Sequence, residues 1–161
     1  EMEKMLNEYL QFASSGAEGN TETFNLSELI ENIIKKYENS NIVKDFSSNV
    51  YFIGRKNLIQ RCINNLIDNS IKYGEKITVK IVKEKSNILI LIDDDGPGID
   101  ESEYQNITKP FYKIDKSRSD YKSSVGLGLA IASDIIKSHG GDISFDKSEL
   151  GGLKVIISLP V

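Results

Sequence analysis

Apolar residues recur every three or four positions in four stretches of the chain, a spacing that places them on one face of an α-helix. The stretches cover residues 1–14, 26–37, 55–73 and 126–139. Asn25 and Glu28 have the spacing of a capping pair and predict where the second helix begins. Gly140 and Gly141 are typical of a helix C-terminus and predict where the fourth helix ends.

Shorter stretches alternate apolar and polar residues or run apolar, as β-strands do. They cover residues 42–46, 49–54, 76–84, 87–93, 142–147 and 153–160. We expect 76–84 and 87–93 to be adjacent strands joined by a short turn, and 49–54 to pair with 42–46. Because the elements come in runs and not in strict alternation, the pattern predicts an α+β fold. The expected architecture is a two-layer α/β sandwich, with three helices on one face of a mixed, mostly antiparallel sheet of about five strands.

The chain is expected to divide into an N-terminal helix, a linker and one domain. Residues 1–14 form the helix, whose apolar stripe is expected to pack on a partner helix. Residues 15–22 are polar and contain glycine, as linkers do, and residues 23–161 form the domain. The chain opens in mid-helix without a cap, which suggests a piece of a longer protein. Residues 95–125 lack periodicity, and so long a loop is either disordered or a functional lid, placed at about residues 100–124.

Composition and charge exclude some classes of partner. The 161 residues carry a net charge of -4 and have the hydrophobic and charged content of an ordinary globular domain. No basic run offers a surface that could follow a phosphate backbone, so no nucleic acid is expected as a partner. No apolar run reaches the length of a membrane span, so we expect no membrane contact by this segment and a cytoplasmic location. The one cysteine, Cys62, is expected to be a small buried residue in a reduced compartment.

The predicted helix at 55–73 carries a polar strip opposite its apolar stripe. Arg61, Asn65, Asn69 and Lys72 follow at three- and four-residue spacing and therefore share a face. Amide oxygens are suitable ligands for Mg²⁺, and a lysine beside them suits a phosphate group. The alternative interpretation is a solvated polar face, which is the usual fate of such side chains on a helix.

Two glycine-containing segments suggest a nucleotide site but leave alternatives open. The glycines of "VGLGLAI" would let a phosphate approach free N–H groups at the positive end of the helix dipole, although tight helix packing explains them equally well. The turn "LIDDDGPGID" at residues 91–100 is harder to interpret, because aspartates repel phosphate. It is a solvated loop, a metal site or one wall of a nucleotide pocket.

Four blocks of the sequence, taken in order, resemble those of the histidine-kinase catalytic and ATP-binding domain. "NNLIDNSIKY" resembles its N box, "DDDGPGI" its first glycine box, "KPFYKID" its phenylalanine box and "VGLGLAI" its second glycine box. The resemblance covers residues 21–161 and implies the Bergerat-type fold of a superfamily that also contains gyrase, heat-shock chaperone and MutL ATPases. The "GGLKVIISLP" ending is similar to osmosensing kinases of the EnvZ type, and residues 1–14 resemble the end of a dimerisation and phosphoacceptor helix.

The resemblance assigns roles position by position. Asp94 matches the acid that recognises the adenine amino group, and Phe111 matches the aromatic anchor of the lid. The residues implied in catalysis are Asn65, Lys72, Lys113 and Arg118. The residues implied in nucleotide binding are Asn69, Tyr73, Asp94, Gly96, Gly98, Ile99, Phe111, Gly126, Leu127, Gly128 and Leu129. Asn69 and Asn65 are the implied Mg²⁺ ligands, Asn69 the stronger. The chain departs from the family pattern at Ser123 and Ser124, and at Lys113, where arginine is common.

The residue at position 65 indicates which reaction the resemblance implies. ATPases and serine kinases of the superfamily carry a glutamate base where this chain has Asn65, which cannot take a proton. A histidine acceptor needs less help, since its neutral imidazole already offers a lone pair, so we expect a histidine kinase. A superfamily ATPase or serine kinase and a degenerate nucleotide-binding module are the alternatives.

The resemblance also implies cofactors and partners. The cofactors are ATP and Mg²⁺, and the partners are an upstream dimerisation and phosphoacceptor domain, a response regulator and a second copy in the full-length protein, which is expected to be anchored in the inner membrane. The one histidine of the chain, His139, is expected to bind the last carbonyls of a helix and not to accept phosphate. We therefore expect this segment to bind ATP without phosphorylating itself.

Overall fold

The boundaries of the helices and strands follow the hydrophobic periodicity closely. The computed structural model describes residues 3, 6–7, 10, 20–46, 49–112 and 127–161. The helices are α2 (Leu26–Lys35), α3 (Lys56–Tyr73) and α4 (Gly128–Ser138), with a 3₁₀ helix at Glu101–Glu103. The strands are β1 (Glu22–Asn25), β2 (Asn41–Asp45), β3 (Tyr51–Gly54), β4 (Lys76–Lys83), β5 (Asn87–Asp94), β6 (Asp142–Lys147) and β7 (Leu153–Pro160).

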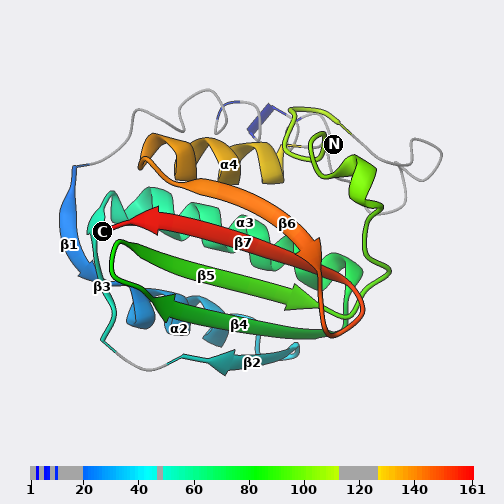
Figure 1. Ribbon diagram of the computed structural model, residues 1–161, viewed down its shortest axis with the longest axis horizontal. Coiled ribbons are helices and arrows are strands. Elements are labelled where there is room, and N and C mark those ends of the chain that lie inside the picture. The colour runs from blue at the N-terminus through cyan, green and yellow to red at the C-terminus, as the bar shows by residue number, and fades with distance from the viewer. Residues whose placement is uncertain (1–2, 4–5, 8–9, 11–19, 47–48, 113–126) are drawn as a thin grey trace.

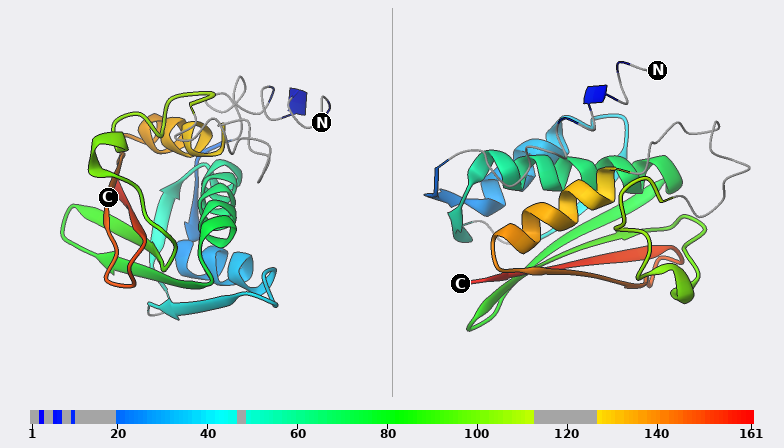
Figure 2. Two further views of the ribbon diagram at one scale, coloured as in Figure 1. Left: turned by 90° about the vertical axis from the view of Figure 1, so that its right-hand side faces the viewer. Right: turned by 90° about the horizontal axis from the view of Figure 1, so that it is seen from above.

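The strands build a five-stranded sheet in the order β2-β4-β5-β7-β6, and β1 and β3 form a separate antiparallel pair. Within the large sheet β2 runs parallel to β4, and the other neighbours are antiparallel. The three helices lie together behind this sheet, as Figures 1 and 2 show. The predicted fold class, a two-layer sandwich with a mixed and mostly antiparallel sheet, is confirmed.

One predicted strand pairing is wrong. The segment at 49–54 was expected to pair with 42–46, but β3 pairs with β1, a strand that the periodicity did not predict. Phe24 of β1 and Phe52 of β3 face each other in register, and their rings meet edge to face at 6.0 Å. β2 pairs instead with β4, because the α3 crossover is long enough to return the chain in the parallel direction.

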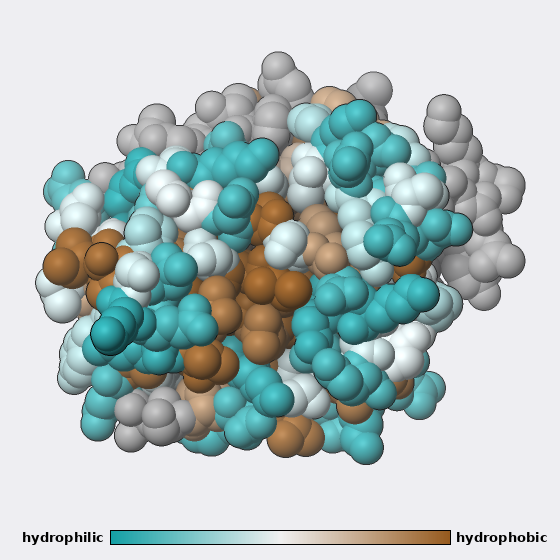
Figure 3. All heavy atoms as spheres, viewed as in Figure 1, coloured by the Kyte–Doolittle hydropathy of each residue, from teal (hydrophilic) through white to brown (hydrophobic). Residues whose placement is uncertain are grey.

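The core lies between the helices and the inner face of the sheet. Alternate residues of β4, β5 and β7 point inward and are fully buried, as are the apolar stripes of α2, α3 and α4. The opposite face of the sheet is open, and the middle of this face carries apolar side chains (Figure 3). Its half-buried or exposed apolar residues are Val82, Leu89, Leu91 and Ile156.

Local signals fix the ends of two helices as predicted. The side chain of Asn25 accepts a hydrogen bond from the backbone N–H of Glu28 at 3.0 Å, which caps α2. Beyond α4, Gly140 takes a left-handed φ of 76°, a conformation that a residue with a Cβ adopts at a cost. The N–H of Gly141 then donates to the carbonyl of Ile136 at 2.9 Å, which closes the last turn. Cys62 is fully buried, as predicted, and burial raises the pKa of its thiol.

Much of the predicted N-terminal helix and lid lies outside the described residues. Of residues 1–14, the structure describes positions 3, 6, 7 and 10, all of which are helical, so the proposed helix, linker and domain boundaries stay predictions. The first part of the predicted lid packs against the sheet, since Ile107 is buried and the ring of Tyr104 lies 6.1 Å from that of Phe145. Ser123 and Ser124 lie outside the described residues. Within the described part of the chain, no helix is long and apolar enough to cross a membrane.

We expect the alternation along β5 to govern stability. Ile90 is fully buried beneath the helices, whereas its neighbour Leu91 lies half-buried on the open face. Ile90→Ala should lower the free energy of unfolding by about 2–5 kcal/mol, because it leaves a cavity. The matched change Leu91→Ala should cost about 1 kcal/mol. Urea denaturation measures both, and equal losses would contradict the assignment of inner and outer faces.

Candidate functional site

The central residue of the candidate site is Asp94, the last residue of β5. Its side chain is almost completely buried, and its Oδ1 atom accepts hydrogen bonds from the backbone N–H groups of Gly96 at 2.9 Å and Leu153 at 3.2 Å. Burial raises the pKa of this carboxyl group, and the two N–H donors oppose that rise. Its Oδ2 atom makes no hydrogen bond with the described residues. The turn therefore fixes one oxygen and leaves the other available to a ligand.

Glycines surround Asp94 because the backbone comes too close for side chains. A Cβ on Gly152 would lie 2.1 Å from Asp94 Oδ1, and a Cβ on Gly96 would lie 2.5 Å from the carbonyl oxygen of Tyr73. Glycine is favoured at position 98 for a different reason, since the φ of 73° there is a left-handed conformation. The N–H of Gly152 also donates to the backbone carbonyl of Asp94 at 3.0 Å. The Gly96 turn and the Gly152–Leu153 segment thus hold the carboxylate in one orientation.

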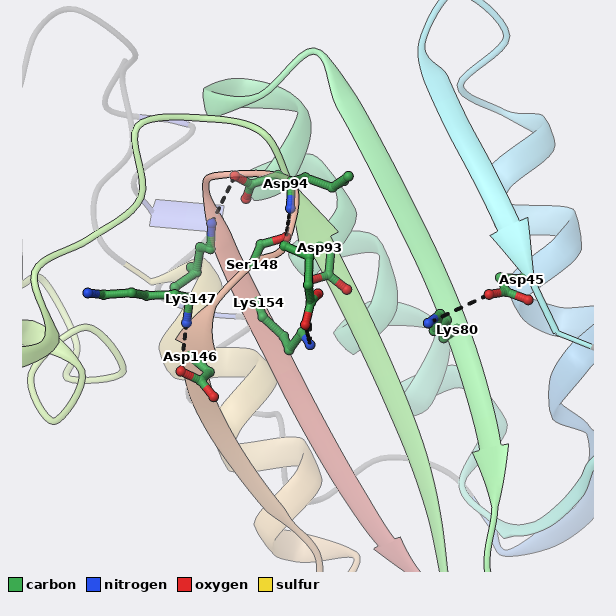
Figure 4. Close-up of polar contacts among 11 residues, drawn as sticks. Asp45, Lys80, Asp93, Asp94, Asp146, Lys147, Ser148 and Lys154 are labelled. Atoms are coloured by element: carbon green, nitrogen blue, oxygen red, sulfur yellow. Dashed lines mark hydrogen bonds and ion pairs between the residues drawn. The ribbon is translucent and has the colours of Figure 1, made fainter.

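The other two aspartates of the triplet make contacts within the fold. Asp93 Oδ1 lies 4.0 Å from Lys154 Nζ, across the boundary between β5 and β7 (Figure 4). Asp95 Oδ1 accepts hydrogen bonds from the backbone N–H groups of Glu75 at 2.8 Å and Lys76 at 3.0 Å, which hold the pKa of that carboxyl below its usual value. The contacts of Asp93 and Asp95 therefore lie within the fold, and the role of Asp94 toward a ligand stays a prediction.

The polar strip of α3 begins beside α4 and runs to the Asp94 turn. Asn65 Nδ2 lies 3.5 Å from the backbone carbonyl of Gly128, so its Oδ1 atom remains an acceptor. The side chain of Asn69, one turn further along, makes no hydrogen bond with the described residues. Tyr73 ends the helix, and its carbonyl lies against Gly96. About 12 Å of helix axis separates Asn65 from Tyr73, so the strip joins two distinct ends of the site.

The start of α4 combines buried leucines with an open glycine. Leu127 is fully buried, so it could contact a ligand only through its backbone, whereas Leu129 is partly buried against the core. A Cβ on Gly128 would meet no atom within 4 Å among the described residues. Among the described residues no side chain caps this end of the helix, and the first N–H groups of a helix have no partner within the helix itself. Gly126, the first glycine of this box, lies outside the described residues.

The remaining predicted residues are placed only in part. Ile99 is partly buried against the core, and Phe111 is 53% exposed with a φ of 64°, which is strained for an aromatic residue. Lys72 lies in the last turn of α3, on the predicted face. Lys113 and Arg118, the two predicted lid cations, lie outside the described residues. Their roles stay predictions, as do those of all the site residues.

Sequence reasoning missed two contributors to the site, Gly152 and Leu153. The pair of glycines before β7 was interpreted as a turn, but Gly152 also provides the space that Asp94 occupies. Leu153 contributes its backbone N–H, which depends on the fold and not on the identity of the side chain. The "GG" pair was the only available signal, because nothing in a sequence shows which backbone N–H will face a distant carboxylate.

The architecture is similar to that of solved kinase catalytic domains. The catalytic domain of the histidine kinase ThkA, in a nucleotide-free form, has a TM-score of 0.74 at 26% identity, over 88% of this chain and 97% of that one. The sensor histidine kinase CpxA of Escherichia coli is 37% identical over 109 residues, which cover 67% of this chain and 24% of the relative. The sensor protein SrrB of Staphylococcus aureus is 33% identical over 174 residues, which cover 99% of this chain and 29% of the relative.

Fold and relatives together define a histidine-kinase type of ATP-binding domain. A sequence profile described as "Histidine kinase-, DNA gyrase B-, and HSP90-like ATPase" matches residues 54–161. The chain belongs to that family, which implies ATP binding, and the predicted family is confirmed. The chain spans about a quarter of the length of these curated relatives. The narrower likeness to osmosensing kinases stays a prediction.

Two glycine-to-alanine changes should behave differently. Gly152→Ala places a Cβ against the Asp94 carboxylate and should lower the free energy of unfolding by about 1–3 kcal/mol through overpacking. Gly128→Ala places its Cβ in open space at the first helical position and should change that free energy by less than about 0.5 kcal/mol. Urea denaturation at neutral pH checks both. A Gly152→Ala protein as stable as the wild type would show that the approach to Asp94 is not tight.

Proposed function

We propose that this chain is the ATP- and Mg²⁺-binding catalytic domain of a two-component sensor histidine kinase. It would transfer the γ-phosphoryl group of ATP to a histidine in an upstream dimerisation domain, for relay to a response regulator. The observation that carries the proposal is Asp94, a buried carboxylate with one oxygen held by two backbone N–H groups and the other left to a ligand. We also propose that the domain is cytoplasmic and that the full-length protein is a membrane-anchored homodimer.

The base end of the nucleotide would lie at the Asp94 turn. The Oδ2 atom can accept a hydrogen bond from the adenine amino group, a contact that guanine, with a carbonyl at that position, cannot make. Because Oδ1 is fixed by the N–H groups of Gly96 and Leu153, the carboxylate loses little freedom when it binds. In this proposal three aspartates can stand in a nucleotide site, because Asp94 would contact the base and the phosphates would lie elsewhere.

The phosphate end would lie between α3 and the first turn of α4. The open position at Gly128 and the uncapped N–H groups beside it suit an anion. Asn69 and the Oδ1 atom of Asn65 offer neutral, hard oxygen donors, which fit Mg²⁺ shared with phosphate oxygens. When bound, the ion would neutralise charge that develops on the transferred group. Lys72, Lys113 and Arg118 are proposed to add positive charge at this end.

Asn65 supports phosphoryl transfer to histidine over hydrolysis. A water or serine nucleophile needs a base to take its proton, and an amide cannot serve. A neutral imidazole attacks with its own lone pair, so positioning and charge stabilisation suffice. His139 is an unsuitable acceptor, since both its ring nitrogens are already engaged within the fold. The acceptor would therefore lie in the upstream domain.

Asp94→Asn should abolish base recognition without weakening the fold. Asparagine keeps an oxygen for the two backbone N–H donors but loses the charge whose burial is unfavourable, so the free energy of unfolding at pH 7 should not fall. Affinity for ATP should fall at least about tenfold, the loss expected for a charged hydrogen bond. Calorimetric titration with ATP and Mg²⁺ measures the affinity.

The matched control for that change is Asp95→Asn. Asp95 caps the start of β4 and is not proposed to touch the base, so its substitution should leave ATP affinity within about twofold of the wild type. If Asp94→Asn bound ATP as tightly as Asp95→Asn, the proposed base pocket would be wrong.

The phosphoacceptor can be tested by adding the upstream domain in trans. With radiolabelled ATP and Mg²⁺, this chain alone should acquire no acid-labile label, while the cognate upstream domain should be labelled when this chain is present. Stable labelling of the chain alone would overturn the proposed acceptor. Steady release of phosphate without the upstream domain would favour a superfamily ATPase, and ATP binding without either reaction would favour a degenerate binding module.

A further inference from the structure

Polar contacts fix the alignment of α3 and α4, which run antiparallel. At the start of α4, Asn65 Nδ2 lies 3.5 Å from the carbonyl of Gly128. In the middle of the pair, Cys62 Sγ lies 3.7 Å from the carbonyl of Ala132. The third contact lies at the opposite end of the pair, about 15 Å along α4 from Gly128, and it is by far the most extensive.

That end contact is centred on the ring of His139, the residue that follows α4. Its Nε2 atom accepts a hydrogen bond at 3.0 Å from the backbone N–H of Arg55, the N-cap residue that precedes α3. Its Nδ1 atom lies 2.8 Å from the carbonyl of Ile135, to which it must donate, because Nε2 is an acceptor. One neutral imidazole therefore joins the last turn of α4 to the N-cap residue of α3.

The surroundings of His139 are built to hold this ring. A Cβ on Gly54 would lie 2.9 Å from the ring carbon Cδ2, so the absence of a side chain there makes room for it. The ring of Phe52 packs at 6.0 Å on another side. The guanidinium of Arg55 donates to the hydroxyl of Ser138 at 2.7 Å and to its carbonyl at 3.2 Å, which closes the junction.

We infer that His139 is a positioning residue for the phosphate end of the nucleotide site, through its control of where α4 lies along α3. The inference rests on the proposed function. The first turn of α4 has no side-chain cap and touches α3 only loosely at Asn65. Its position beside the polar strip is therefore set by the packing of the helix and by the tight junction at its far end. His139 itself touches no nucleotide.

Protonation of His139 would break the junction. An imidazolium carries hydrogens on both nitrogens, so Nε2 would face the N–H of Arg55 donor to donor. Among the described residues, the groups that face the His139 ring are the hydroxyl of Ser138 from α4, uncharged Phe52 and Gly54 from β3, and the Arg55 cation from the start of α3.

Burial and the Arg55 charge lower the pKa of His139 from its ordinary value of 6.5, and the hydrogen bond to the Ile135 carbonyl acts in the opposite direction. The stability that neutral His139 contributes is complete above pH 6.5 and is lost as the pH falls toward the lowered pKa.

The test compares His139→Phe with a core change on the same helix pair. Phenylalanine keeps a ring in place but removes both hydrogen bonds, so the Kd for ATP should rise by roughly three- to thirtyfold. Ile63→Val removes one methyl group from the buried face of α3 and should leave the Kd unchanged while it lowers stability. Titrations are run at a temperature where all proteins are folded. A Kd unchanged in His139→Phe, as in Ile63→Val, would reduce His139 to a structural residue and overturn the inference.

A second measurement needs no nucleotide and separates this inference from the proposed function. The backbone N–H of Ile131 donates to the carbonyl of Leu127 at 2.8 Å in the first turn of α4. Its hydrogen exchange, relative to the slowest amides of β5, should accelerate in His139→Phe and not in Ile63→Val. If the wild type bound no ATP, the proposed function would fail, and the exchange rates alone would decide whether His139 positions α4. Equal exchange in the two variants would contradict that role.

His139→Gln keeps the test decisive if the phenylalanine variant does not fold. Glutamine offers an amide oxygen to the N–H of Arg55 but cannot titrate near neutral pH. As the pH falls from 7.5 through the lowered pKa of His139, the Kd for ATP should rise more steeply in the wild type than in His139→Gln, because titration of the phosphates is common to both. Parallel pH profiles would overturn the inference.

Discussion

The position of α3 is the constraint on which the rest of the site depends. Its apolar stripe is buried against the inner face of the sheet, and this burial turns its polar strip toward α4 and the end of β5. Asn65 then lies beside Gly128, and the C-terminal carbonyl at Tyr73 lies against Gly96. A helix driven into place by hydrophobic burial therefore brings together two segments, the Asp94 turn and the start of α4, that are more than thirty residues apart in the chain.

The two ends of the site solve different physical problems. At the base end, a buried carboxylate is tolerated because two N–H groups offset part of the cost of its burial. At the other end the fold provides neutral amide oxygens and a helix start that no described side chain caps, a combination that suits phosphate and a hard cation. Separation along α3 keeps the aspartates away from the anionic part of the proposed ligand. The acidic turn and a phosphate site can therefore coexist in one small domain.

Periodicity predicted nearly all of the fold, and its failures have a common physical cause. The helices and the large sheet follow from burial patterns such as the alternation of β5, and the start of α2 follows from the Asn25 cap. The short strand β1 was missed and its partner β3 was mispaired, because the two strands meet through a ring contact between residues distant in the chain, Phe24 on Phe52. For the site, motif resemblance selected Asp94 from three aspartates, yet Gly152 and the bond between His139 and Arg55 depend on tertiary contacts alone. A local sequence pattern carries no trace of such contacts.

The central claim is that one nucleotide occupies both ends of the site at once. Titration of the isotopically labelled chain with ATP and Mg²⁺, followed by amide chemical shifts, tests it most directly. The N–H of Gly96, beside the base, and the N–H of Gly128, beside the phosphates, should shift with a single common Kd, while adenosine should shift Gly96 far more than Gly128. Shifts at only one of these glycines, or two different dissociation constants for ATP, would contradict a site that spans α3.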